Sequence, residues 1–180
     1  VRSRRQRQMC IRDSLIAFQK LTILLKMFDV VLLEPQIPPN TGSTGRLCGA
    51  TNCRLHVVGK LGFELSDKTL KRAGLDYWDN ISWEYYPDIN AYYEYLIKKG
   101  NIHLLTTKSP YKYTSRNFKP GDSIVFGSET RGISEKFLNE NWDKTCTIPM
   151  ENKNIRSLNL ATSVGIVLYE AIRQNEQNNK

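Results

Sequence analysis

The stretch CTIPMENKNIRSLNLATSVGIVLYEAI, which runs from Cys146 to Ile172, decides the fold of this chain. It opens with a short apolar run, passes through a polar loop, and continues into a mostly apolar segment from Leu158 to Ile172. We expect a helix that begins at Ser157, because a serine side chain can accept hydrogen bonds from the free amides of a first turn. A helix that is apolar around its whole circumference has little solvent face. The stretch therefore predicts a helix that is central or lies at a subunit interface, with a polar ligand loop before it.

Upstream of this stretch, short apolar runs alternate with helical segments. Strands are predicted at 28–33, 55–58, 81–86, 102–107, from 123 onward and at 146–150, and helices at 41–53, before Gly74, and at 89–100 and 134–142. This alternation predicts an α/β fold with a mostly parallel sheet flanked by helices. Ligands of such sheets bind beyond the carboxyl ends of the strands. The loops PNTG, TTKS, GSETRG and IPMENKNIRS all follow strands, so we expect them to build one shared site.

The chain has 180 residues, which suits one domain, and a net charge of +8 that is unevenly distributed. Residues 1–26 carry seven basic residues and one acidic residue, a net charge of +6, whereas the rest carries 19 basic and 17 acidic residues. The segment RRQRQMCIRDS resembles translated sequencing adapter, and Gln19 and Lys20 interrupt the apolar run that a signal peptide would need. An arginine-rich presequence is the alternative. We expect a non-native or disordered leader at 1–26 and a single domain at 27–180, so the leader's charge is no evidence for RNA binding.

The cysteines argue against a metal site. They show no CxxC pair and no nearby histidine cluster, which predicts reduced thiols in the cytoplasm: Cys10, Cys48, Cys53 and Cys146. No apolar run approaches the roughly 18–20 residues needed to cross a bilayer. We therefore expect a cytoplasmic protein that binds neither a metal nor a membrane.

The GSETRG turn at 127–132 is a candidate ligand loop, because its glycines would let a ligand approach the backbone while Glu129 and Arg131 face the site. The alternative is a strand-to-helix turn in which these two side chains form a surface ion pair. Neither a Walker A motif nor GxGxxG is present, which disfavours nucleotide hydrolases and ordinary dinucleotide enzymes.

Other polar residues also allow two interpretations. Arg46 faces the same site if Asn40 does, and is otherwise a solvated helix arginine; His56 and His103 lie in apolar strands and are expected to be packed core histidines. Basic and aromatic residues alternate in two segments, a mixture that suits phosphates and unstacked bases, although an ordinary surface is favoured without other evidence: Lys68, Lys71, Arg72, Tyr77, Trp78, Lys108, Tyr111, Lys112, Tyr113, Arg116 and Lys119.

Several of these motifs together resemble one family. Residues 27–174 closely resemble the SPOUT-class RNA 2′-O-ribose methyltransferases, and within them the small TrmL/YibK-type enzymes that modify the wobble nucleotide of tRNA. The matching runs are EPQIPPNTGSTGRLC, LHVV, KRAGLDYW, LTTK, FGSETRG, IPM and RSLNLATSVGIVLYEAIRQ. The resemblance implies a C-terminal deep trefoil knot that holds S-adenosyl-L-methionine, a homodimer through the C-terminal helix, and tRNA as partner. No metal is implied.

The resemblance also implies roles for individual residues. Four residues would line the cofactor site: Leu105, Gly127, Ile148 and Ser157. Arg46 would act on the ribose 2′-hydroxyl, with three residues framing the catalytic site: Asn40, Glu129 and Asn159. The chain departs from the family at Ser43-Thr44-Gly45, where relatives often have Asn-Ile-Ala or Asn-Ile-Ile, and at Ala161, where many have Ser.

The implied reaction transfers a methyl group from a sulfonium to a ribose oxygen, which requires in-line positioning and removal of the hydroxyl proton. Arg46 would polarise the hydroxyl and hold the neighbouring phosphate. The implied target is the wobble cytidine or uridine of tRNA. The alternatives are the same chemistry at another tRNA or rRNA nucleotide, and a non-catalytic binding module, which the intact site residues disfavour.

Overall fold

A computed structural model describes residues 28–64, 81–152 and 154–177. Its strands form one sheet in which every neighbouring pair is parallel, in the order β3-β2-β1-β5-β4-β6. They are β1 (Asp29–Leu33), β2 (Arg54–Val58), β3 (Trp83–Tyr86), β4 (Ile102–Leu105), β5 (Ser123–Phe126) and β6 (Thr145–Cys146). The predicted parallel α/β fold is confirmed.

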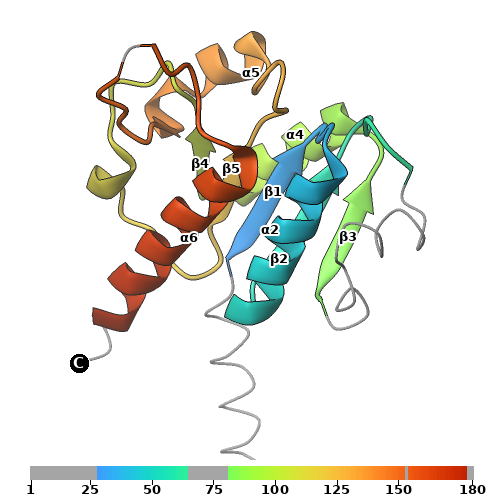
Figure 1. Ribbon diagram of the computed structural model, residues 1–180, viewed down its shortest axis with the longest axis horizontal. Coiled ribbons are helices and arrows are strands. Elements are labelled where there is room, and N and C mark those ends of the chain that lie inside the picture. Colours follow the sequence, from blue (N-terminus) through green and yellow to red (C-terminus); the bar gives the residue numbers. More distant parts are fainter. Residues whose placement is uncertain (1–27, 65–80, 153, 178–180) are drawn as a thin grey trace, which may run out of the picture.

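Helices cover both faces of the sheet (Figure 1). Those described are α2 (Pro38–Thr51), α4 (Ile89–Lys99), α5 (Glu135–Glu140) and α6 (Leu160–Gln177), with short 3₁₀ turns η2 (Tyr113–Ser115) and η3 (Trp142–Lys144). Helices α2 and α6 lie on one face and α4 on the other. The molecule therefore has three layers, with the sheet in the middle.

Strand β1 lies near the centre of the sheet and is buried along its whole length. Because side chains alternate along a strand, Val30 and Leu32 belong to the core under α2 and α6, whereas Val31 and Leu33 belong to the core under α4 and α5. The continuous apolar run at 28–33 correctly predicted a strand buried on both faces.

The closing helix differs from its prediction in two ways. It begins at Leu160 rather than Ser157, and Asn159 caps it by accepting a hydrogen bond from the Thr162 amide at 3.2 Å. It is also amphipathic, since it buries one side and exposes the other. The buried residues recur with helical spacing and are Leu160, Val164, Val167, Leu168 and Ala171, whereas Thr162, Tyr169, Arg173 and Glu176 are exposed. The apolar composition of the segment had hidden this exposed face.

Other predicted boundaries also differ, and two predicted segments cannot be compared. Helix α2 begins at Pro38 rather than 41, because proline suits a first turn in which an amide has no helical partner. The last strand ends at Cys146 rather than 150, shortly before Pro149, which has no amide to donate to a ladder. The predicted basic helix before Gly74 and the leader at 1–26 lie outside the described residues.

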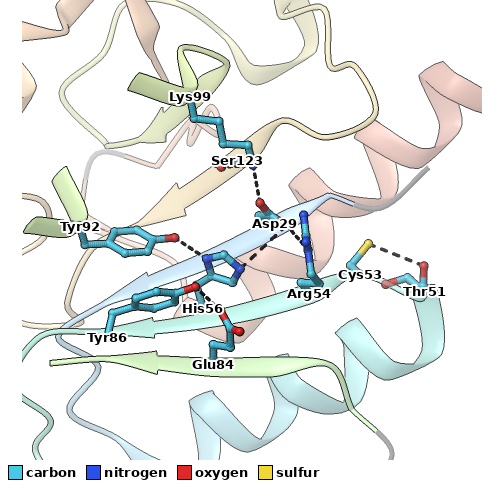
Figure 2. A network of polar contacts seen from close by, with 10 residues as sticks. All are labelled: Asp29, Thr51, Cys53, Arg54, His56, Glu84, Tyr86, Tyr92, Lys99 and Ser123. Atoms are coloured by element: carbon cyan, nitrogen blue, oxygen red, sulfur yellow. Dashed lines mark hydrogen bonds and ion pairs between the residues drawn. The ribbon is translucent and has the colours of Figure 1, made fainter. Parts of the chain in front are cut away.

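A buried charge ties together the amino-terminal edge of the sheet (Figure 2). Asp29 is fully buried and accepts a hydrogen bond from Arg54 Nε at 2.7 Å and another from Lys99 at the end of α4. Lys99 also donates to Ser123 Oγ at 2.9 Å. Asp29, Arg54 and Ser123 are register partners at the starts of three adjacent strands. The network therefore joins these strands to α4.

Both histidines are packed within the sheet, as predicted. His56 is 4% exposed, and its Nδ1 lies 2.5 Å from the Tyr92 hydroxyl. Burial lowers the pKa of His56, because an apolar environment disfavours the charged imidazole. His103 Nε2 lies 2.9 Å from a carboxylate oxygen of Asp122, and its ring packs on Phe118.

We expect Asp29→Asn to destabilise the fold by roughly 2–4 kcal/mol, because it leaves the partly buried Lys99 and the more exposed Arg54 without their shared counter-charge. Urea unfolding followed by circular dichroism would measure this. Glu94→Gln removes one carboxylate from the exposed face of α4 and serves as the matched control. Equal stability of the two variants would show that the Asp29 network does not hold the sheet edge.

Candidate active site

A cavity of about 520 Å³ lies at the carboxyl ends of β4, β5 and β6. Its size falls within the roughly 300–1,000 Å³ typical of small-molecule sites. Its walls come from the loops after these strands, from the start of α2 and from the start of α6. The loops that were expected to share one site therefore do so.

All four residues expected to line a cofactor line this cavity: Leu105, Gly127, Ile148 and Ser157. Three of the four expected catalytic residues also line it: Asn40, Glu129 and Asn159. The wall combines apolar side chains such as Leu105, Ile148 and Leu158 with hydroxyl groups of Thr106 and Ser157. This combination suits a ligand with an apolar ring and several polar groups.

Glu129 is held by the start of α2. Its Oε2 accepts a hydrogen bond from the Gln36 amide at 2.8 Å, and its Oε1 accepts from the Ile37 amide at 3.2 Å and from Asn40 Nδ2 at 2.8 Å. Amides at a helix start lack helical partners, and a carboxylate there is favoured by the helix dipole. Helix α2 has no side-chain cap of its own. Both oxygens of Glu129 are therefore engaged by the protein.

Asn40 connects Glu129 to the start of α6. Its Nδ2 donates to Glu129, and its Oδ1 accepts from Asn159 Nδ2 at 2.9 Å. Asn159 in turn caps α6 through the Thr162 amide. Asn40 is 6% exposed, so water competes little for these bonds. The relay from Glu129 through Asn40 to Asn159 fixes three cavity loops relative to one another.

Gly127 is required by close packing of the GSETRG turn. A Cβ at this position would lie 2.1 Å from the carbonyl carbon of Gly132 and 2.2 Å from the amide of Ile133. The turn itself is closed by a hydrogen bond from the Gly132 amide to the Ser128 carbonyl at 2.8 Å, and Gly132 has a φ of 70°. No other residue fits at Gly127 unless the turn moves away from the end of β5.

The two charged residues of this turn, Glu129 and Arg131, do not form the surface ion pair that was considered as the alternative to a ligand loop. Arg131 also lines the cavity, but it pairs with Glu34 at 3.0 Å rather than with Glu129. The surface ion pair considered for Glu129 and Arg131 is therefore wrong. Sequence reasoning missed Glu34 as the partner of Arg131, because the two residues are 97 positions apart in the chain. It also gave no separate role in the cavity to Lys108, which follows β4.

Arg46 does not line the cavity. It lies on α2 six residues after Asn40, which places it about 120° away around a helix of 3.6 residues per turn. Asn40 is buried, whereas Arg46 is exposed. The structure thus brings Asn40, Glu129 and Asn159 together and places Arg46 on another side of α2.

The predicted basic and aromatic segments are only partly described, because those between 65 and 80 lie outside the described residues. In the other segment, the Arg116 guanidinium stands 5.0 Å from the centre of the Tyr111 ring, and Tyr111 is 47% exposed.

Within 28–64, 81–152 and 154–177, no helix is long and apolar enough to cross a membrane.

Comparisons with known proteins identify the family. The model of the SpoU rRNA methylase family matches residues 27–169. The chain belongs to this methylase family. A tRNA (cytidine(34)-2'-O)-methyltransferase from Methylovorus glucosotrophus is 44% identical over 151 residues, which cover 83% of this chain and 97% of the relative.

Solved structures agree with this membership. One from work on the 2-OH methylation of C/U34 on tRNA has a TM-score of 0.78 and 37% identity, and the match covers 84% of this chain and 98% of that one. The SpoU methyltransferase AviRb from Streptomyces viridochromogenes, in complex with AdoMet, has a TM-score of 0.70 at 23% identity, over 84% and 62% of the two chains. This last likeness concerns the fold alone.

We expect Gly127→Ala to weaken binding of S-adenosylmethionine by about 5- to 150-fold, because the added methyl group must push the turn out of place at a cost of roughly 1–3 kcal/mol. Titration calorimetry would measure the affinity. Gly165→Ala adds the same methyl group on α6, outside the cavity wall, where it would meet only Leu47 Cδ2 at 3.9 Å; it is the control and should bind within about twofold of the wild type. Unchanged affinity in a folded Gly127→Ala protein would separate this turn from cofactor binding.

Proposed function

We propose that this chain is a cytoplasmic, S-adenosylmethionine-dependent tRNA 2′-O-ribose methyltransferase that acts on the wobble cytidine or uridine at position 34. The observation that carries the proposal is one cavity lined by all four expected cofactor residues and three of the four expected catalytic residues, in a member of the SpoU family. The relatives named for methylation of cytidine 34 support the choice of substrate.

The cavity suits the cofactor in chemical terms. Leu105, Ile148 and Leu158 would hold the adenine ring, and Ser157 with the backbone beside Gly127 would bind the polar groups. When bound, S-adenosylmethionine supplies a methyl group that is already activated by its sulfonium. The protein then has to place the ribose oxygen in line and help its proton leave.

The proposal includes a trefoil knot formed by the C-terminal part of the chain. Contacts of the segment after β4 support it. Tyr113 donates its amide to Thr147 at 2.9 Å, after the end of β6. Arg116 and Phe118, further along the same segment, contact Gln174 in the last turns of α6. The Gln174 side chain donates to the Arg116 carbonyl at 3.0 Å and accepts from the Phe118 amide at 3.0 Å. One loop thus contacts both β6 and the helix that follows it.

The proposed chemistry gives different tasks to the polar residues. Glu129, Asn40 and Asn159 would act as positioning residues, because their hydrogen bonds join the cavity loops to one another. Arg46 would contact the ribose hydroxyl and the neighbouring phosphate through its planar guanidinium, which can hold two oxygens at once. Its side chain would polarise the hydroxyl as the hydroxyl proton passes to solvent, because a guanidinium is already protonated.

A homodimer is the second part of the proposal. Arg46 is exposed and outside the cavity of its own protomer, and α2 packs beside α6, which exposes Tyr169 to an extent of 55%. A symmetric dimer through the exposed sides of these helices would bring Arg46 of one protomer to the cavity of the other. Val164 and Leu168 of α6 are fully buried within the protomer, so they do not belong to this dimer surface.

We expect Arg46→Lys to lower kcat for tRNA methylation by roughly 100-fold or more, because the lysine keeps the charge but loses the planar fork. The affinity for S-adenosylmethionine should stay within about twofold, since Arg46 would contact the ribose and the phosphate rather than the cofactor. Transfer of a tritiated methyl group to tRNA and calorimetry on the same preparation would measure both quantities. A kcat equal to that of the wild type in this variant would show that Arg46 takes no part in the reaction. If the wild type transfers the methyl group to rRNA but not to tRNA, rRNA rather than tRNA is the substrate.

Mixed dimers test whether Arg46 acts across the interface. Heterodimers of Arg46→Lys with Gly127→Ala would contain one site with an intact cavity and an intact arginine from the partner. Random mixing should restore about one quarter of wild-type activity, since half of the dimers carry one active site of two. If Arg46 acts within its own protomer, mixing restores nothing. Sedimentation must show a dimer for both variants; a wild-type monomer that is active would refute the assembly.

A further inference from the structure

Among the residues that the structure describes, two cationic side chains line the cavity, and each is paired with a carboxylate outside its wall. Lys108 pairs with Glu135 at the start of α5, and Arg131 pairs with Glu34 after β1. Glu129, the acidic residue of the wall, is engaged by amides and by Asn40. The mouth of the cavity is therefore lined by cations whose positions are set by neighbouring acids.

The Arg131–Glu34 pair is the more firmly built of the two. In the Lys108 pair, the side chains are 57% and 75% exposed, whereas Glu34 is only 26% exposed. Glu34 has a φ of 47°, in the left-handed region that residues with a side chain seldom adopt. Its amide donates to the Val58 carbonyl at 2.7 Å. The surrounding sheet thus holds Glu34 in a conformation that it would not otherwise prefer.

Contact with Gly59 explains how this conformation fits. A Cβ on Gly59 would lie 2.8 Å from Glu34 Cγ, so the glycine leaves the space that the glutamate side chain passes through. An exposed ion pair contributes little to folding stability, and strained backbone is most often retained where it serves a function. We infer that the arrangement serves to place Arg131 rather than to stabilise the fold.

Arg131 has the chemistry of an oxyanion ligand. Its side chain is 68% exposed, and the bond to Glu34 at 3.0 Å uses one of five N–H donors of the guanidinium. A guanidinium that is already oriented can bind two phosphate oxygens in parallel. Because Arg131 is largely exposed, it suits a ligand that arrives from solvent better than one enclosed in the cavity.

We propose that Arg131, oriented by Glu34, forms a binding site for a backbone phosphate of the RNA next to the ribose that is methylated. The proposal rests on the function proposed above and adds a substrate contact to it. The turn that contains Arg131 also contains Glu129, so the phosphate and the ribose would be positioned by the same rigid loop.

Removal of the guanidinium tests the site. We expect Arg131→Gln to raise the KM for tRNA roughly tenfold and to lower the slope of log affinity for tRNA against log salt by about 0.7–0.9, as for one lost phosphate contact. Affinity for S-adenosylmethionine should stay within about twofold. Lys98→Gln removes one positive charge from the exposed end of α4, at the opposite edge of the sheet, and should change neither tRNA quantity.

Glu34→Gln tests the positioning. It keeps the charge of Arg131, so the salt slope should stay near the wild-type value while the KM for tRNA rises about threefold. The double variant should match Arg131→Gln within about twofold, because Glu34 acts only through Arg131. A pair that only braces the fold would give equal losses of stability in all three variants and no change in salt slope.

The remaining outcomes are also decisive. Wild-type KM and salt slope in Arg131→Gln would overturn the phosphate site. An equal loss of S-adenosylmethionine affinity would assign Arg131 to the cofactor carboxylate instead. If the wild type binds tRNA but methylates none, the proposed function fails, and the salt slope of Arg131→Gln still decides whether Arg131 contacts a phosphate.

Discussion

The cavity depends on one carboxylate. Glu129 accepts the Gln36 and Ile37 amides and the Asn40 side chain, so the loop after β1 and the loop after β5 cannot move independently. Each hydrogen bond to a charged group contributes roughly 1.5–3 kcal/mol. Asn40 extends the constraint to α6 through Asn159. The polar residues that would surround a reacting ribose are thus also the residues that hold the cavity loops in place.

The two edges of the sheet have different roles. At the amino-terminal edge, the starts of β1, β2 and β5 and the end of α4 converge on the buried carboxylate of Asp29. At the carboxyl edge, short loops leave the strands and build the cavity. Rigid strands anchored at one edge can present loops at the other edge in fixed positions. The edge that carries the cavity therefore does not need to supply the stability of the sheet.

Local patterns predicted the elements, and distant contacts decided their ends. Apolar runs located β1 and β5, because burial between two layers of helices leaves a short continuous signal. The edge strand β3 has no buried residue, and its aromatic residues marked it instead. The starts of α2 and α6 were misplaced: Glu129 stabilises one from 92 residues away, and Asn159 rather than Ser157 caps the other. The Arg131–Glu34 pair gives no local signal, since its partners are 97 residues apart. Motif resemblance identified the cavity residues, but only the helix geometry separates Arg46 from them.

The sequence separation of these contacts has a consequence for biosynthesis. Asn159 and Asn40 are 119 residues apart, and the cavity wall extends from Ile37 to Ser163. Most of the chain must therefore be synthesised and leave the ribosome before a complete ligand pocket can form. Contacts of such range must close large loops, which slows folding. A small molecule that binds only the finished pocket favours the folded protein over earlier intermediates by mass action, so the cellular supply of that molecule would influence how much of this protein reaches its native state.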